Sequence, residues 1–250
     1  VSWNALMVSA YVRAFRATGQ SSYADRAVAL CTTLFHSAQC DDGSLLHTIS
    51  NKQPIPGFLE DYASLMQALA DVYSITMQRW CADAAFALAD HVHENFRGES
   101  DPLYNFSSKL HPALFMPTVE TYDNVIPSSN AAMANALYDL GVLCDRVDLT
   151  GRALHLLSAV RLGVVEHPAA FAHWTSLYFR AASNPLHISV SGAYTQDQLQ
   201  TLLHTCDPHI YVSWHESNSS DLTISVCDRN SCLPPIRSFD DLFSYLRSRM

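Results

Sequence analysis

Two adjacent carboxylates stand in the stretch of this sequence with the greatest potential for chemistry. Residues 56–63 (PGFLEDYA) combine a turn dipeptide, two aromatic residues, Glu60 and Asp61 at the expected start of a helix. The helix continues to about residue 77 and is apolar on nearly every side, which indicates that it is buried on all sides. Polar side chains are costly inside such a bundle, so those in the first turn are expected to face a cavity or a capped helix end.

Polar and aromatic residues also open two other expected helices. Trp3 and Asn4 stand at the start of the first, and Ser128-Ser129-Asn130 stand at the start of another. If these helices form the inner layer of a ring, their first turns converge on one mouth. Aromatic faces stack on the C–H surfaces of pyranoses, while carboxylates and amides hydrogen-bond hydroxyl groups. We therefore predict a carbohydrate-binding mouth with the following residues: Trp3, Asn4, Phe58, Glu60, Tyr62, Ser128 and Asn130.

Helix capping is the competing interpretation for part of this set. Ser128 and Asn130 are residue types that favour the N-cap. Glu60, near the third helical position, complements the helix dipole. Both interpretations stay open for Ser128 and Glu60, whereas the mouth is favoured for Trp3, Asn4 and Asp61.

The candidate catalytic residues are two carboxylates on neighbouring hairpins. Glycoside hydrolysis uses two carboxyl groups roughly 5–10 Å apart across the scissile bond. Glu60 and Asp61 are consecutive and point about 100° apart on a helix, so we predict the pair Asp61 and Asp123. An epimerase instead needs two acid/base groups, typically His, beside the sugar carbon. Only His167 and, one turn later, His173 lie near an inner first turn, which disfavours an epimerase.

The remaining histidines and cysteines give weaker signals. His91 and His93 are two apart on an amphipathic helix and face different directions, so we expect solvated side chains and no metal site. Cys227 and Cys232 flank an expected turn and could form a thiol pair or a reversible disulfide, although simple burial is favoured. No Gly-rich phosphate-binding motif occurs, so no cofactor is predicted.

Composition restricts the class of protein. The 250 residues carry a net charge of −9, which argues against nucleic acid and anionic membrane surfaces as partners. No apolar run approaches the ~20 residues of a membrane span. Seven cysteines, an odd number without a C-x-x-C pair, indicate reduced thiols and a cytoplasmic location, so no disulfide is expected among Cys31, Cys40, Cys81 and Cys144. No signal peptide precedes Val1, and the first residue is not Met, so we expect the chain to begin inside a longer product.

The periodicity of apolar residues sets the expected elements. Helices that are apolar all round start near residues 2, 57, 127 and 168, and amphipathic helices start near residues 22, 79 and 148. This alternation predicts inner helices ringed by outer ones. The repeats are too irregular in length for the common helical solenoids. After residue 184, strands are expected at 187–190, 210–214 and 222–226, with helices at 195–206 and from 238. The predicted fold is therefore mainly α, with an incomplete (α/α) toroid over residues 1–183 and a small α/β appendage over residues 184–250.

Four motifs in order carry a family resemblance: residues 3–7 (WNALM), 56–63 (PGFLEDYA), 126–130 (IPSSN) and 227–232 (CDRNSC). The chain resembles the C-terminal part of the DUF255 proteins, which include spermatogenesis-associated protein 20. The resemblance implies a six-hairpin toroid similar to those of N-acylglucosamine 2-epimerases and several glycosidases, and an upstream thioredoxin-like domain as partner. The expected helices are too few to close a six-hairpin ring.

Two classes of function follow from these observations. One is a carbohydrate-acting enzyme, either sugar isomerase/epimerase-like or glycosidase-like, with its site at the N-termini of the inner helices. The alternative is a non-catalytic interaction or scaffold domain of a thioredoxin-like multidomain protein. The enzyme requires at least two convergent acid/base groups, whereas a scaffold requires only locally satisfied caps.

Overall fold

The chain forms a row of helical hairpins followed by a small sheet. The computed structural model describes residues 1–49, 54–98, 101–111, 116–183, 185–205, 210–215, 221–228 and 231–249. The helices of the first part are α1 (Ser2–Thr18), α2 (Ser21–Ala38), α3 (Leu59–Thr76), α4 (Arg79–Asn95), α5 (Ser129–Leu143), α6 (Val147–Ala159), α7 (Arg161–Glu166), the 3-10 helix η1 (Pro168–Phe171) and α8 (Ala172–Ala182).

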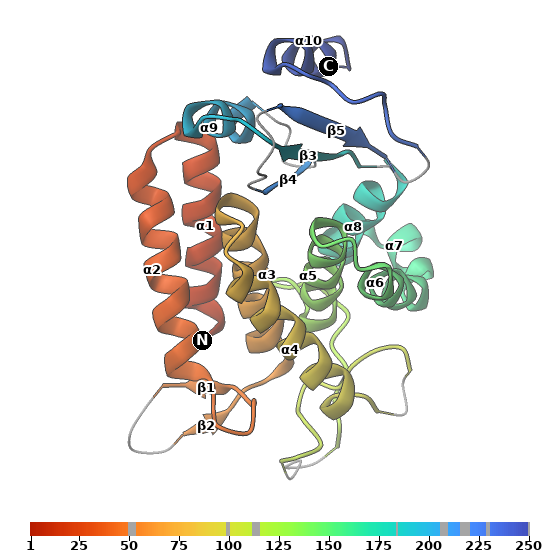
Figure 1. Cartoon of the computed structure of the whole chain (residues 1–250). Coiled ribbons are helices and arrows are strands. Elements are labelled where there is room, and N and C mark those ends of the chain that lie inside the picture. Colours follow the sequence, from red (N-terminus) through yellow and green to blue (C-terminus); the bar gives the residue numbers. More distant parts are fainter. Residues whose placement is uncertain are drawn as a thin grey trace.

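Two helical layers confirm the predicted toroid architecture. The inner row is α1, α3, α5 and α8, in which α3 lies between α1 and α5, and α5 lies between α3 and α8. The outer helices α2, α4 and α6 each pack on the inner helix that precedes them in the chain (Figure 1). The three acidic side chains expected on the outer face of α4, Asp83, Asp90 and Glu94, are exposed.

Burial follows the difference between the two layers. On the inner helix α3, Leu65, Met66 and Leu69 are fully buried, although Met66 points about 100° away from Leu65 around the helix. On the outer helix α4, Leu88 and Val92 are buried while the opposite face meets solvent. Truncation of such a leucine to alanine typically costs roughly 2–5 kcal/mol of stability. The arrangement of buried apolar residues around each helix therefore decides whether the helix lies in the inner or the outer layer.

The second part of the chain is a three-stranded sheet with two helices. Its strands are β3 (His187–Ser191), β4 (Tyr211–His215) and β5 (Thr223–Cys227), in the order β4-β3-β5. β3 pairs in parallel with β4 and antiparallel with β5. Helix α9 (Gln196–Thr205) connects the two parallel strands, and α10 (Phe239–Arg249) ends the described chain. A two-stranded ribbon of β1 (Leu46–Thr48) and β2 (Ile55–Pro56) precedes α3.

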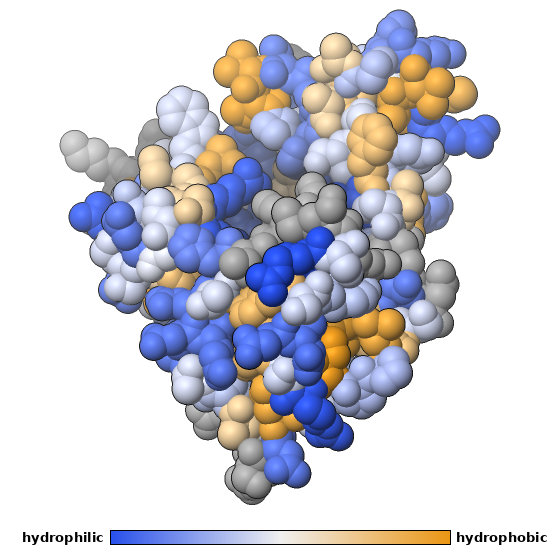
Figure 2. Space-filling view, turned by 90° about the horizontal axis from the view of Figure 1, so that it is seen from above, coloured by the Kyte–Doolittle hydropathy of each residue, from blue (hydrophilic) through white to orange (hydrophobic). Residues whose placement is uncertain are grey.

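The sheet part packs on the C-terminal ends of the inner helices (Figure 1). α9 contacts α1, and β4 contacts α3 and α5. On the face seen in Figure 2, described hydrophobic residues form small groups separated by hydrophilic ones. Every described helix is too short or too polar to cross a lipid bilayer. The change from helices to sheet falls where the sequence places its domain boundary, but the division into domains 1–183 and 184–250 stays a prediction.

The outer segment of the third hairpin and the start of the fourth inner helix differ from the prediction. The outer segment expected over 148–165 breaks at Val160 into α6 and α7, and α8 begins at Ala172 rather than at Pro168. Pro168 instead starts the 3-10 turn, where its missing N–H has no helical partner to lose. Gly163 permits the close fold of α7 on this turn, because a Cβ there would clash with the ring of Phe171.

Candidate functional site

A cavity of about 770 Å³ runs along the facing sides of the inner helices. Trp3 of α1 and Glu60 of α3 line it near the N-terminal ends of these helices. Leu203 and His204 of α9 and Tyr211 of β4 line it near their C-terminal ends. The sheet part therefore closes one end of a cavity whose walls are helices.

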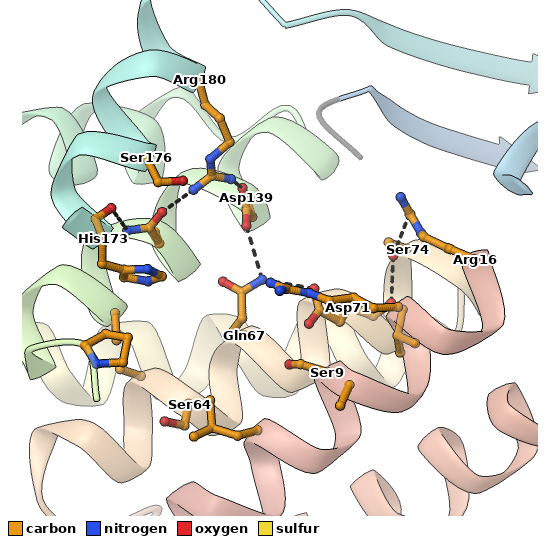
Figure 3. Close-up of a pocket in the computed structure, with 18 of the residues that line it drawn as sticks. Ser9, Arg16, Ser64, Gln67, Asp71, Ser74, Asp139, His173, Ser176 and Arg180 are labelled. Atoms are coloured by element: carbon orange, nitrogen blue, oxygen red, sulfur yellow. Dashed lines mark hydrogen bonds and ion pairs between the residues drawn. The ribbon is translucent and has the colours of Figure 1, made fainter. Parts of the chain in front are cut away.

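One polar stripe on the otherwise buried helix α3 faces this cavity. It consists of Glu60, Ser64, Gln67, Asp71 and Ser74, which are spaced by four and three residues. That spacing places them on one side of a helix. The other inner helices contribute similar stripes: Ser2, Ser9, Arg13 and Arg16 on α1, Asn135 and Asp139 on α5, and His173, Ser176 and Arg180 on α8 (Figure 3). Apart from Glu60 and His173, these stripe residues were not predicted, because the predicted site was confined to the first turns of the inner helices.

An ion pair between two inner helices, α5 and α8, lies on one wall of the cavity. The guanidinium of Arg180 pairs with Oδ1 of Asp139 and also donates to the side-chain oxygen of Asn135. The hydroxyl of Tyr211 donates a 2.6 Å hydrogen bond to the same Asp139 oxygen. Burial by itself would lower the pKa of Arg180, but Asp139 and Tyr211 raise it overall. Arg180 is therefore a fixed cation, held by side chains of helix α5 and strand β4.

Gln67 connects this pair to a second carboxylate. Its side-chain amide nitrogen donates to Oδ2 of Asp139 at 3.1 Å and to Oδ1 of Asp71 at 3.0 Å. Burial raises the pKa of Asp71, although hydrogen bonds from Ser9 and Gln67 partly offset it. The two carboxyl groups thus differ, since Asp139 is bound to a cation while the environment of Asp71 favours its protonated form.

His173 is the histidine whose ring Figure 3 shows directed into the space between α8 and α3. Its backbone is fixed on both sides, because its N–H donates to Oδ2 of Asp123 at 2.7 Å and its carbonyl accepts from Asn135 at 3.2 Å. Burial lowers the pKa of its imidazole, with a partial offset from Asp123. A neutral imidazole inside a polar cavity is suited to accept a proton.

The two carboxylates predicted as the catalytic pair both cap helix ends. Asp61 is fully buried and accepts hydrogen bonds from the N–H of Phe58 at 2.9 Å, the N–H of Ser2 at 3.1 Å and the ring of His47 at 2.9 Å. His47, Glu60 and Asp61 together could approach one metal ion, but both Asp61 oxygens already accept these hydrogen bonds, so Asp61 serves as a cap.

Asp123 joins the starts of two inner helices. It accepts the N–H of Ser128 at 2.9 Å, before α5, and the N–H of His173 at 2.7 Å, in the first turn of α8. Neither Asp61 nor Asp123 is among the residues that line the cavity. A catalytic role for the pair stays a prediction that the cavity does not support.

Two of the predicted sugar-binding residues line the cavity. Trp3 is largely exposed there, and Glu60 lies beside it. Burial, and then the charge of Asp61, raise the pKa of Glu60. Ser128 is buried and lines only a smaller neighbouring hollow of about 430 Å³, which Glu60 also reaches. A carbohydrate-binding mouth at these residues stays a prediction.

The other predicted binding residues do not line the cavity. Asn4 is exposed but does not line the cavity. Phe58 stacks on Phe106 with ring centroids 4.8 Å apart. The other two are buried: the hydroxyl of Tyr62 accepts the N–H of Leu45 at 2.8 Å, and the side chain of Asn130 bonds both backbone groups of Tyr104, at 2.8 and 2.9 Å. These contacts fix the loops around the helix starts.

Two expectations on histidine and cysteine are wrong. His91 and His93 are half-buried rather than solvated, and burial lowers the pKa of both. His91 stacks on Tyr62, and His93 meets the edge of Tyr104.

The second error concerns the cysteine pair after β5. Cys227 and Cys232 form a disulfide across the turn, with Cα atoms 4.0 Å apart, so the alternative to simple burial is correct. Cys31, Cys40, Cys81 and Cys144 are free, as predicted.

The sequence similarity of this chain to known proteins is low. No protein-family model matches the chain. The uncharacterized protein B0495.5 of Caenorhabditis elegans is 26% identical over 161 residues, which cover 61% of this chain and 22% of that protein. The chain thus spans about a fifth of that relative's length. Membership in the DUF255 family, a thioredoxin-like partner and a cytoplasmic location stay predictions.

Two solved structures are similar over most of the chain. The GH76 α-mannanase BT2949 of Bacteroides thetaiotaomicron superposes with a TM-score of 0.58 at 16% identity, over 81% of this chain and 55% of the mannanase. A D-mannose isomerase gives a TM-score of 0.51 at 16% identity, over 63% of this chain and 39% of the isomerase. The protein is therefore a mainly α protein with an incomplete (α/α) toroid of the type found in these enzymes and a small sheet.

Proposed function

We propose that the cavity binds a small sugar and that His173 transfers a proton at a carbon of that sugar, as in isomerisation or epimerisation. The observation that carries this proposal is the placement of His173, whose pKa burial lowers, in a polar cavity that the fixed Arg180–Asp139 pair also lines. The similar toroids named as an α-mannanase and a mannose isomerase support a sugar as the ligand.

Each group on the cavity wall has a task in such a reaction. Gln67, Asn135 and Asp139 offer hydrogen-bonding groups to sugar hydroxyls, and the exposed indole of Trp3 offers a stacking surface at the N-terminal end. His173 would take the proton from the carbon next to the carbonyl. Arg180 would stabilise the negative charge that develops on the enediolate oxygen. Return of the proton from His173 to the neighbouring carbon gives the isomer, whereas epimerisation also requires a second acid/base group on the other face of the sugar.

Glycoside hydrolysis is the second candidate, for a specific reason. Asp71 and Asp139 accept hydrogen bonds from the same Gln67 nitrogen, and their environments differ in the way that a general acid and a carboxylate partner require. However, Gln67 lies between the two carboxyl groups, and it would have to move aside for a glycosidic bond to lie there. Proton transfer at His173 requires no such movement of Gln67 and is therefore preferred.

Deuterium exchange tests the proposed function directly. The chain is incubated in D₂O with glucose, mannose or fructose, and the proton NMR signal at C2 of the aldoses, or at C1 of fructose, is followed. We expect loss of this signal for at least one sugar, and no loss with H173Q. The matched control is H155Q, which changes an exposed histidine on the outer helix α6.

Three outcomes separate the candidates. Binding of a sugar without exchange would refute the proton transfer. Release of mannose from an aryl mannoside, lost in D71N, would favour the hydrolase. A thermal-shift panel of sugars with no response at all would favour the scaffold.

A further inference from the structure

The smaller hollow of about 430 Å³ adjoins the cavity near the N-terminal ends of α3 and α5. Three residues, Glu60, Ile126 and Pro127, line both the hollow and the cavity. Pockets that bind small molecules have volumes of roughly 300–1,000 Å³, and each of the two spaces is large enough on this scale. A ligand in the cavity can therefore extend past Glu60 into the hollow.

The wall of the hollow is fixed on the neighbouring helices. It consists mainly of residues 119–128. The indole of Trp174 on α8 donates to the carbonyl of Thr121 at 2.9 Å, and the side chain of Asn130 on α5 donates to the carbonyl of Glu120 at 3.0 Å. Because this wall is held in place by the fold, a ligand would not have to order it on binding.

Tyr122 offers a flat surface in the hollow. Its ring is 66% exposed, and it packs against the buried ring of Phe171 with ring centroids 5.0 Å apart. An aromatic ring that is fixed on one side and open on the other is suited to stack on the C–H face of a pyranose. Trp3 offers a similar exposed ring in the cavity, so each of the two spaces has an aromatic surface.

The hydroxyl of Ser128 has no hydrogen-bond partner in the described part of the chain. Ser128 lines the hollow, is only 3% exposed, and forms no capping hydrogen bond with α5 through its side chain. Buried polar groups without a partner are rare in native proteins, so this hydroxyl indicates a partner from outside the protein. Glu60, whose side chain is partly exposed, adds a carboxylate that accepts hydrogen bonds where the two spaces meet.

Asp123 connects the hollow to His173. Its Oδ1 accepts the N–H of Ser128 at 2.9 Å, and its Oδ2 accepts the N–H of His173 at 2.7 Å. A single carboxylate therefore separates the backbone of a residue that lines the hollow from the backbone of the histidine that lines the cavity. The hollow lies within reach of the second unit of a sugar whose first unit is at His173.

We propose that the ligand is a sugar of at least two units, with its reducing unit in the cavity at His173 and the next unit in the hollow, stacked on Tyr122 and hydrogen-bonded by Ser128 and Glu60. This inference rests on the proposed sugar site and specifies the length of its substrate. The reducing unit carries the carbonyl group that proton transfer at His173 requires. The second unit supplies binding energy away from the reacting carbon.

Matched pairs of sugars test the second subsite. Titration calorimetry compares glucose with cellobiose and maltose, and mannose with mannobiose. We expect at least one disaccharide to bind roughly ten- to a hundredfold more tightly than its monosaccharide. Y122A should remove most of this gain, whereas Y122F should keep it, because stacking requires the ring and not the hydroxyl. Y178A changes a tyrosine that is 53% exposed on α8 and is not among the residues that line the hollow, so it should change nothing.

Two neighbouring serines provide a second matched pair of variants. The hydroxyls of Ser128 and Ser129 are both buried without a partner among the described residues, but only Ser128 is among those that line the hollow. S128A should weaken disaccharide binding several-fold and leave the melting temperature unchanged, because no hydrogen bond within the protein is lost. S129A should change neither. A lower melting temperature of S128A with unchanged disaccharide affinity would show that this hydroxyl serves the fold alone and would contradict its place in the subsite.

The failures of the two proposals are distinguishable. Equal affinity for monosaccharides and disaccharides would overturn the second subsite, even if deuterium exchange with a monosaccharide supports the proton transfer. A preference for disaccharides that Y122A leaves unchanged would overturn the location of the subsite in the hollow. Disaccharides that bind through Tyr122 but show no exchange would keep the subsite and refute catalysis by His173.

Discussion

The hydroxyl of Tyr211 on β4 donates a 2.6 Å hydrogen bond to the carboxylate of Asp139 on α5, 72 residues earlier in the chain. Asp139 also pairs with Arg180 of α8 and accepts from Gln67 of α3. One carboxylate therefore connects the sheet part to three inner helices. The sheet part therefore contacts the cavity wall through Tyr211 as well as closing one end of the cavity.

Removal of the Tyr211 hydroxyl should weaken the contact between the sheet part and α5 but leave the Arg180–Asp139 ion pair in place. We expect Y211F to lower the free energy of unfolding by about 1–3 kcal/mol, because a hydrogen bond to a charged group is lost in a buried place. Urea unfolding at pH 7 measures the change. The control is Y178F, since Tyr178 is 53% exposed on α8. Equal stability of Y211F and the unchanged protein would show that the sheet is not coupled through Asp139.

The pKa of His173 should be visible in pH titrations. Because burial lowers it, the ring should titrate below the ordinary value of about 6.5. The unfolded chain then binds the proton more strongly, so stability is lost as pH falls from about 6.5 through the lowered pKa. The rate of deuterium exchange should rise with pH through that same pKa and then level off.

NMR titration of the His173 ring, assigned with H173Q, measures the pKa directly. H173Q should also show a weaker loss of stability between pH 7 and pH 5 than the unchanged protein. A ring that titrates above 6.5 would contradict both the burial and the role of a neutral base.

Asp71 should show the opposite pH dependence. Burial raises its pKa, so the folded protein holds this proton more tightly than the unfolded chain, where aspartate titrates near about 3.9. The stabilisation that this bound proton gives to the folded protein is fully present below the pKa of the unfolded chain, and it is lost as pH rises through the raised pKa of the folded protein. D71N cannot ionise and can still accept the hydrogen bond from Gln67, so we expect it to be more stable than the unchanged protein at pH 7 and to lose this advantage near pH 4.

Urea unfolding at these two pH values tests the sign. D25N changes an exposed aspartate on the outer helix α2 and serves as the control. A D71N protein that is less stable at pH 7 would indicate that the ionised carboxylate is required in the fold.

The fold was largely predictable because layers leave a strong signal in a sequence. Inner helices such as α3 are apolar all round and outer helices such as α4 are not, and this difference depends only on burial. The start of α8 was missed because Pro168 is equally suited to open a 3-10 turn. The disulfide was left open because a spacing of five residues between Cys227 and Cys232 does not determine whether a turn brings the sulfurs together.

The site was harder to predict than the fold. Polar residues at or just before a helix start, such as Asp61 and Asp123, fit a capping role and a catalytic role equally well. The stripe from Glu60 to Ser74 was present in the sequence as a polar line at helical spacing on an apolar helix. The partners of this stripe, Asp139 and Arg180, could not be predicted, because they lie on different helices and meet only through tertiary packing.

The capping role of Asp123 can be separated from the catalytic role first predicted for it. D123A leaves the N–H groups of Ser128 and His173 without their acceptor. We expect a loss of about 1–3 kcal/mol in the free energy of unfolding, while D25A, the control, should have little effect. Unchanged stability together with lost sugar binding would instead support the catalytic pair with Asp61.

Thiol reactivity tests the burial of the helical layers. Burial raises the pKa of Cys31 and Cys81 to about 12, and both side chains are fully buried. The thiolate is the reactive form, so iodoacetamide at pH 8 should leave both unmodified in the native protein and modify both after unfolding without reductant. Half-buried Cys40 serves as the internal comparison and should react first. Peptide mapping by mass spectrometry assigns each label, and Cys227 and Cys232 should acquire theirs only after reduction. Rapid labelling of Cys31 or Cys81 in the native protein would mean that α2 or α4 does not stay packed on the inner row.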